Sequence, residues 1–183
     1  MKGTDSMMAN GHVVAALVSP DGRRRVVVEG CNTLLYRCAD AVARLFAGES
    51  AYRPTTIGFV CATESGEDEN FNFTASDRTT QTQGDLVKGG LSVKDVRVEP
   101  AYSFSATPPT AEELAANPAA TSHYQGNKVT FRAMTADNTD SEFIYGFLLK
   151  DAAGRVLAVK KFDKAVERTE GLAMAASWTV TFN

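Results

Sequence analysis

Strict two-residue alternation in GLAMAASWTVTF, residues 171–182, is the feature that most constrains how this chain can fold. One set of alternate positions holds the large apolar side chains together with an alanine: Leu172, Met174, Ala176, Trp178, Val180 and Phe182. Successive side chains of a β-strand point to opposite faces, so the segment predicts a long strand with one buried face. The other face is small and polar rather than charged, and a neighbouring subunit could cover part of it.

Most other apolar runs also predict antiparallel strands joined by tight turns. VVAALV (13–18) and RRRVVV (23–28) flank a Pro-Asp-Gly turn, which is typical of a hairpin. FIYGFLLK (143–150) is apolar on both faces, which predicts a central strand. In LSVKDVRV (91–98) the valines fall on both faces, and a β-bulge near Lys94-Asp95 would return them to one face. Eight to ten such strands predict a mainly-β protein, an antiparallel β-sandwich of the jelly-roll type.

One amphipathic helix is predicted near residues 32–47. Asn32 is suited to the N-cap, because its side chain can accept a hydrogen bond from a free backbone amide. Gly48 can end the helix in the left-handed conformation. Apolar side chains at helical spacing form the face that we expect to be buried: Leu34, Leu35, Cys38, Val42, Leu45 and Phe46.

Two polar segments lengthen the single domain, which is predicted to span residues 1–183. The loop at 63–85 is rich in turn formers, and long loops in compact domains are usually functional or mobile. The insertion at 107–123 contains a short predicted helix, for which Thr110 and Glu113 form a capping box.

Charge and cysteine content argue against several kinds of partner and scaffold. The net charge is −3 with both signs mixed, which does not favour binding to nucleic acid or to an anionic membrane. The three cysteines include no C-x-x-C pair, which argues against a disulfide scaffold and a zinc ribbon. The longest apolar run is far shorter than the ~20 residues of a membrane span. We therefore expect no nucleic-acid partner, no membrane partner and no cofactor.

Motifs of catalysis are missing from the sequence. Neither His12 nor His123 lies in a zinc motif, and no nucleophile elbow, P-loop or dinucleotide fingerprint is present. Two alternatives remain open. The acidic stretch ESGEDEN, residues 64–70, could bind Ca²⁺, and two carboxylates facing each other in a groove could hydrolyse a glycoside. We expect a structural or binding protein without catalytic residues or metal ligands.

Three aromatic residues in polar segments are candidate contacts with a partner or receptor: Phe71, Phe73 and Tyr124. Aromatic side chains are enriched at the centres of protein interfaces. Phe71 and Phe73 could equally cover an edge of the core.

A pattern of fold-forming positions runs through the second half of the chain: Val129, Phe131, Ile144, Gly146, Phe147, Gly154, Leu157, Ala158, Phe162, Val166, Arg168, Thr169, Leu172, Trp178, Thr179, Val180 and Phe182. Residues 32–34, 45–48 and 57–60 extend the pattern more loosely. This pattern resembles a diverse family of tailed-bacteriophage structural proteins, described as tail-fibre, baseplate or accessory virion proteins. Tyr145 departs from it, because the family usually has glutamate before its GLF strand.

The resemblance implies a non-enzymatic virion structural protein, a subunit of the tail, baseplate or neck or a head accessory such as a capsid decoration. It implies assembly contacts with other virion proteins, a homo-oligomer (trimer or ring), and synthesis in the bacterial host cytoplasm without a signal peptide. Its strongest markers are core positions: Phe131, Gly146, Phe147, Trp178 and Phe182. The alternative is a carbohydrate- or receptor-binding β-sandwich, on or off a virion, that contacts a host surface glycan.

Overall fold

The computed structural model describes residues 9–107, 109–118 and 123–182, with the backbone alone for 102–107 and 123–127. Nine of its elements are strands: β1 (Ala9–Val18), β2 (Arg24–Leu34), β3 (Pro54–Ala62), β4 (Ser92–Arg97), β5 (Glu99–Thr107), β6 (His123–Met134), β7 (Glu142–Asp151), β8 (Val156–Arg168) and β9 (Ala173–Phe182). Its helices are α1 (Tyr36–Phe46), α2 (Gln83–Leu86), α3 (Ala111–Ala116) and two 3₁₀ turns, η1 (Ser50–Tyr52) and η2 (Asp68–Asn70). Every strand pairing is antiparallel, which confirms the predicted mainly-β antiparallel class.

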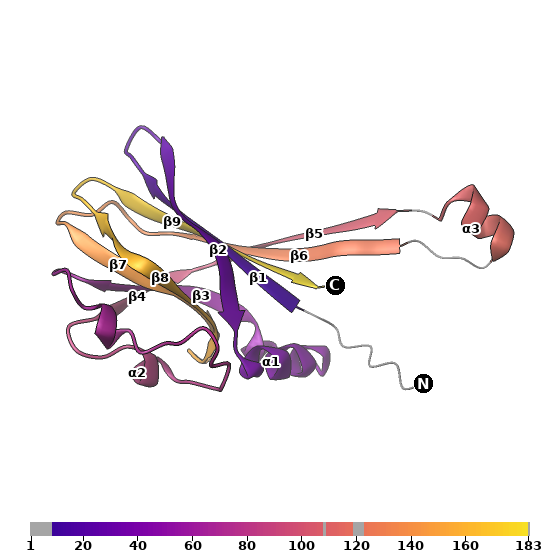
Figure 1. Ribbon diagram of the computed structural model, residues 1–183, viewed down its shortest axis with the longest axis horizontal. Helices are drawn as coiled ribbons and strands as arrows, with labels where there is room; N and C mark the ends of the chain where they lie inside the picture. The colour runs from indigo at the N-terminus through magenta and orange to yellow at the C-terminus, as the bar shows by residue number, and fades with distance from the viewer. Residues whose placement is uncertain (1–8, 108, 119–122, 183) are drawn as a thin grey trace.

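The nine strands form one continuous sheet in the order β4-β3-β7-β8-β2-β1-β9-β6-β5 (Figure 1). β2 connects two halves of this sheet, because it pairs along most of its length with β1 but with β8 only at Thr33 and Leu34. We call these the β9 half (β2, β1, β9, β6, β5) and the β7 half (β8, β7, β3, β4). Large side chains from both halves fill one interior, which includes Val13, Phe59, Phe131, Phe147 and Trp178. The two halves thus pack face to face as the layers of a sandwich do, but they belong to one continuous sheet and not to two separate sheets.

β9 confirms the predicted alternation. Met174, Ala176 and Trp178 are buried in the shared interior, and Ala175 and Ser177 between them lie on the outer face. Phe182 packs against the same interior but is only half-buried, because it lies at the end of the strand. The β1–β2 hairpin is also confirmed, with Gly22 at a positive φ of 82° in its turn.

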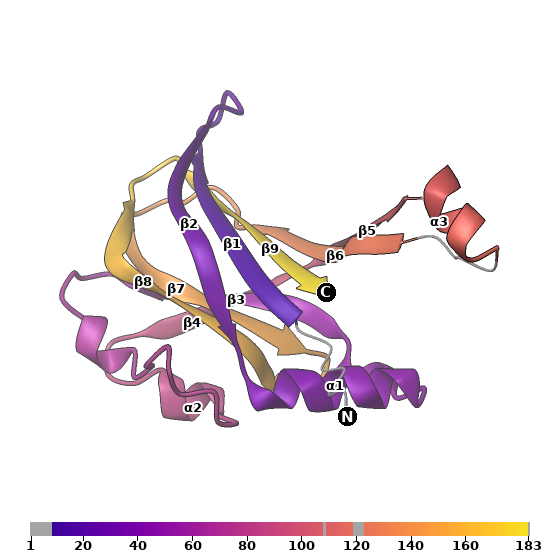
Figure 2. The ribbon, with the colours of Figure 1, turned by 45° about the vertical axis from the view of Figure 1, so that its right-hand side comes forward.

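β7 is buried on both faces, as its sequence predicted. One face contributes to the shared interior, whereas Tyr145 and Leu148 belong to a second cluster on the outer side, with Phe71 and Leu86. The segment that contains η2 and α2 supplies this outer layer and lies beneath the β7 half in Figure 2. The second layer explains why a strand without polar alternation can fold here.

The β-bulge predicted near Lys94-Asp95 is wrong, because β4 pairs with β3 in regular register. Val96 lies opposite Ile57 and packs against the shared interior, while Val93 lies opposite Val60 and packs against the outer cluster. Apolar side chains on both faces therefore need no bulge, since the β7 half has a core on each side.

The helix also differs from its prediction at both ends. It begins at Tyr36 after Leu35, which makes no side-chain cap, and Asn32 lies in β2 instead of at the N-cap. β2 continues to Leu34 because its last residues pair with β8. Gly48 ends the helix as predicted, with φ at 90° and its amide bonded to the Leu45 carbonyl at 3.0 Å. Phe46 is 87% exposed, so its predicted burial is wrong.

Candidate functional site

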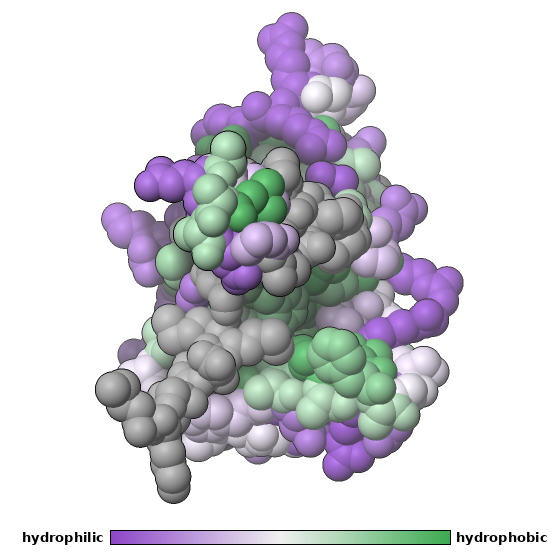
Figure 3. All heavy atoms as spheres, turned by 90° about the vertical axis from the view of Figure 1, so that its right-hand side faces the viewer, coloured by the Kyte–Doolittle hydropathy of each residue, from purple (hydrophilic) through white to green (hydrophobic). Residues whose placement is uncertain are grey.

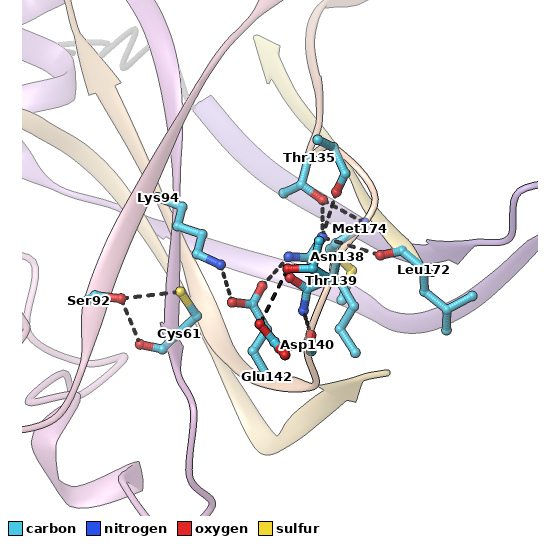
Figure 4. Close-up of polar contacts among 12 residues, drawn as sticks. Cys61, Ser92, Lys94, Thr135, Asn138, Thr139, Asp140, Glu142, Leu172 and Met174 are labelled. Atoms are coloured by element: carbon cyan, nitrogen blue, oxygen red, sulfur yellow. Dashed lines mark hydrogen bonds and ion pairs between the residues drawn. The ribbon is translucent and has the colours of Figure 1, made fainter. Parts of the chain in front are cut away.

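A buried ionic network is centred on the Glu142 carboxylate (Figure 4). The Arg168 guanidinium, 2% exposed, donates to one carboxylate oxygen of Glu142, to the Thr135 hydroxyl and to the Ala136 carbonyl. Lys94 donates to the other oxygen of Glu142. Both carboxylate oxygens thus face cations, and the network ties β4, β7 and β8 to the start of the β6–β7 connection. Such a saturated carboxylate is suited to holding strands together rather than to accepting a substrate proton.

Cys38 and Cys61 have thiols with raised pKa values, which makes them unsuited to nucleophilic chemistry. Burial raises the pKa of the Cys38 thiol to about 11, against a smaller lowering by the nearby Arg78 charge. Burial also raises the pKa of Cys61, which exchanges a hydrogen bond with Ser92 at 3.4 Å. Because the thiolate is the reactive form, both side chains behave as apolar core residues at neutral pH.

The described residues bring together no cluster of three or more His, Cys, Asp or Glu side chains that could hold a metal. In the acidic stretch considered for Ca²⁺, the Glu67 carboxylate accepts hydrogen bonds from the Asn70 amide and from the Gly90 backbone N–H. That carboxylate therefore fixes the loop. Within the same described ranges, no helix has the length and apolar content needed to cross a membrane.

The 63–85 loop is a fixed cover over the β7 half. The Tyr145 hydroxyl donates to the Glu64 carbonyl at 3.0 Å and accepts from the Glu67 amide at 3.2 Å. Arg78 donates to the Leu34 carbonyl at 2.8 Å. Tyr145, the residue that departs from the phage-family pattern, thus anchors the loop to β7.

The three aromatic residues predicted as partner contacts have different environments in the structure. Phe71 is fully buried against β7, so it is removed as a contact residue and covers the core instead. Phe73 is half-buried beside a hollow of about 370 Å³ that Lys160, Lys161 and Asp163 also line. Tyr124 lies in β6, and its side chain is outside the described part.

The β5–β6 hairpin forms an arm that extends beyond the rest of the sheet (Figure 1). β9 ends its pairing with β6 at Asn127, so the first residues of β6, 123–125, pair only with β5 within the described chain. α3 lies at the far end of the arm, and none of its residues is buried. The capping box predicted from Thr110 and Glu113 is present at its start. We use "arm" for α3 together with the part of the β5–β6 hairpin that lies between α3 and Asn127.

Large apolar side chains at the surface are the feature that sequence reasoning missed. The exposed ones are Val26, Tyr36, Phe46, Leu114 and Met134. Figure 3, in which the arm points at the viewer, shows hydrophobic residues low on this face at the level of α1 and others on the arm in front. No local signal separates these residues from core residues, because exposure depends on what the rest of the chain covers.

Comparisons with protein-family models, with curated proteins and with solved structures found no match. The resemblance to tailed-bacteriophage structural proteins therefore stays a prediction from the sequence.

Proposed function

We propose that this protein is a non-enzymatic structural subunit of a bacteriophage virion that acts through assembly contacts with other proteins. The phage context comes from the sequence resemblance described above. The proposed mode of action rests on two features that lie outside the packed core: the arm and the exposed apolar side chains.

The arm is the observation that carries this proposal. A two-stranded hairpin is at best marginally stable in water, and a helix as short as α3 has little stability of its own. The arm leaves the body of the protein (Figures 1 and 2), and none of the residues of α3 is buried. Such an element gains stability when a partner protein covers it, which is an arrangement suited to an assembly subunit.

The exposed apolar side chains favour the same mode of action. Tyr36, at the start of α1, lines a surface groove of about 160 Å³ with mainly apolar residues, and Phe46 is exposed at the other end of the helix. Contiguous apolar surface on a folded protein marks sites of protein contact.

The test is the protein content of purified phage particles. We expect mass spectrometry to find this chain at a fixed copy number relative to the major capsid protein, after gradient purification that removes free protein. Its absence from purified, infectious particles would contradict the proposal.

A second candidate function is binding of a host surface glycan at the hollow beside Phe73. An aromatic side chain next to Lys160, Lys161 and Asp163 combines an apolar face with polar groups, as sugar sites require. Glycan-array binding that is lost in Phe73→Ala, but kept in the distant control Thr169→Ala, would support it. An array without binding would count against it.

A further inference from the structure

The outer face of the β9 half carries an apolar floor that no described segment covers. Register places Val26, Ala16, Ala175 and Met134 side by side across β2, β1, β9 and β6. Val26 is 55% and Met134 52% exposed, and the two alanines between them form a low floor. Ala16, Ala175 and Met134 line a groove of about 450 Å³, and Val26 lies next to Ala16.

The rim of this groove is cationic. Arg24, Arg97 and Arg132 line it together with a single carboxylate, Glu99. All three arginines are exposed, and their guanidinium groups form no ion pair with another described residue. The groove therefore suits a segment that presents an apolar side chain flanked by negative charge.

The tip of the arm has this chemistry. Within residues 110–117, α3 carries Glu112 and Glu113 and no lysine or arginine. Leu114 follows them and is 42% exposed. The Glu113 carboxylate accepts hydrogen bonds from the Thr110 amide and hydroxyl, which fixes that charge at the start of the helix.

The arm of one molecule does not reach its own groove. Glu99 lines the groove, and β5 runs from it to Thr107 in eight residue steps, roughly 26 Å of extended strand. α3 lies beyond that point, at the end that points away from the body (Figure 1). An occupant with the charge and shape of α3 must therefore come from another molecule.

We infer that the groove on the outer face of the β9 half binds the α3 tip of a second copy of this chain, with Leu114 on the apolar floor and the glutamates at the arginine rim. The inference rests on the proposed assembly function and names one partner for it. The contact joins two different surfaces, so it leads to a closed ring or to an open chain of subunits.

Two single variants and their mixture test this contact. Leu114→Asp removes the apolar residue of the arm, and Met134→Asp places a charge on the floor of the groove. We expect the wild-type chain to associate with rising concentration in sedimentation velocity, and each variant alone to stay monomeric. An equimolar mixture should give a one-to-one dimer, because each variant keeps the surface that the other has lost.

A matched control is Ala152→Asp, which adds the same charge at an exposed position in the β7–β8 turn, outside both the arm and the groove lining, and should leave association unchanged. Circular dichroism should show that all variants are folded. The charge reversal Arg97→Glu should also abolish association, and added Glu112→Arg on the arm should restore it.

Three results would overturn the inference: a wild-type chain that stays monomeric at every concentration, a Leu114→Asp variant that assembles like wild type, or a mixture that stays monomeric. Each of these leaves the proposed function intact, provided that the chain is still found in purified particles. Conversely, its absence from particles would contradict the proposed function without affecting a contact measured in solution.

Discussion

β7 and β9 are antiparallel strands of ten residues each, and they differ in what covers their outer faces. The outer side chains of β7 lie under the 63–85 loop, whereas Ala175 and Ser177 on the outer face of β9 line the uncovered groove. Their sequences reflect this difference, because β7 is apolar on both faces from Phe143 to Leu149 and β9 alternates large residues with alanine, serine and threonine.

The comparison separates two uses of a sheet surface. In the β7 half, a segment distant in sequence folds back and is held by hydrogen bonds to Tyr145 and by burial of Phe71. In the β9 half, small residues keep the outer face low, so that a partner can approach the sheet closely. We therefore expect changes on the outer face of β7 to affect folding and changes on the outer face of β9 to affect association.

The interior shared by the two halves should give the largest effect. Trp178→Ala is expected to lower the free energy of unfolding by roughly 3–5 kcal/mol, since the ring is fully buried. Urea unfolding followed by circular dichroism measures the change. Trp178→Phe is the matched control: the indole N–H has no hydrogen-bond partner in the described structure, so this variant loses volume alone and should lose less stability. An unchanged midpoint for Trp178→Ala would show that the ring is not in the core.

The outer core of the β7 half should give the next largest effect. Phe71→Ala is expected to cost about 3 kcal/mol, because it leaves a cavity between the loop and β7. Phe73→Ala, two residues away and half-buried, should cost about 1 kcal/mol. Equal and small losses for the two variants would mean that the loop does not form a second core layer.

Local patterns in the sequence were sufficient wherever neighbours along the chain decide the structure. The β9 alternation, the glycine that ends α1 and the capping box at Thr110 all depend on residues a few positions apart. The interior position of Trp178 follows from the same alternation, which leaves the large residues only one face to share.

Other predictions failed because they depend on contacts distant in sequence. The valines of β4 indicated a bulge only as long as the β7 half was assumed to have one core. Phe71 could not be separated from Phe73, because the hydrogen bonds that fix their loop come from β7. The groove of the β9 half combines residues from several strands, and no motif in the sequence indicates that combination.

Gly146 tests how tightly β7 packs against its neighbour. A Cβ at this position would lie 2.2 Å from the Lys160 carbonyl oxygen, which belongs to the backbone of β8 and cannot rotate away. Gly146→Ala should therefore cost about 2 kcal/mol in urea unfolding. Gly154→Ala is the control, because that glycine also has a positive φ but a Cβ added to it would meet no heavy atom within 4 Å, and it should cost about 1 kcal/mol. Equal losses at both glycines would mean that backbone conformation rather than packing sets the cost.

The smallest change in stability is expected on the outer face of β9. Ser177 lies between Val14 and Arg132 in the groove, so Ser177→Glu should change the free energy of unfolding by no more than about 0.5 kcal/mol. The matched control is Ala176→Glu, one position along the strand, which places a carboxylate in the shared interior and should cost roughly 3 kcal/mol or more.

The same Ser177→Glu variant separates folding from association, because it places a negative charge where the glutamates of a second copy would bind. We expect urea unfolding to show wild-type stability, and sedimentation velocity to show a monomer. A large loss of stability would mean that the outer face of β9 is part of the folding core, as it is in β7. Unchanged self-association would instead place the contact elsewhere on the surface, since a carboxylate beside Arg132 should both repel the acidic tip and neutralise the rim that attracts it.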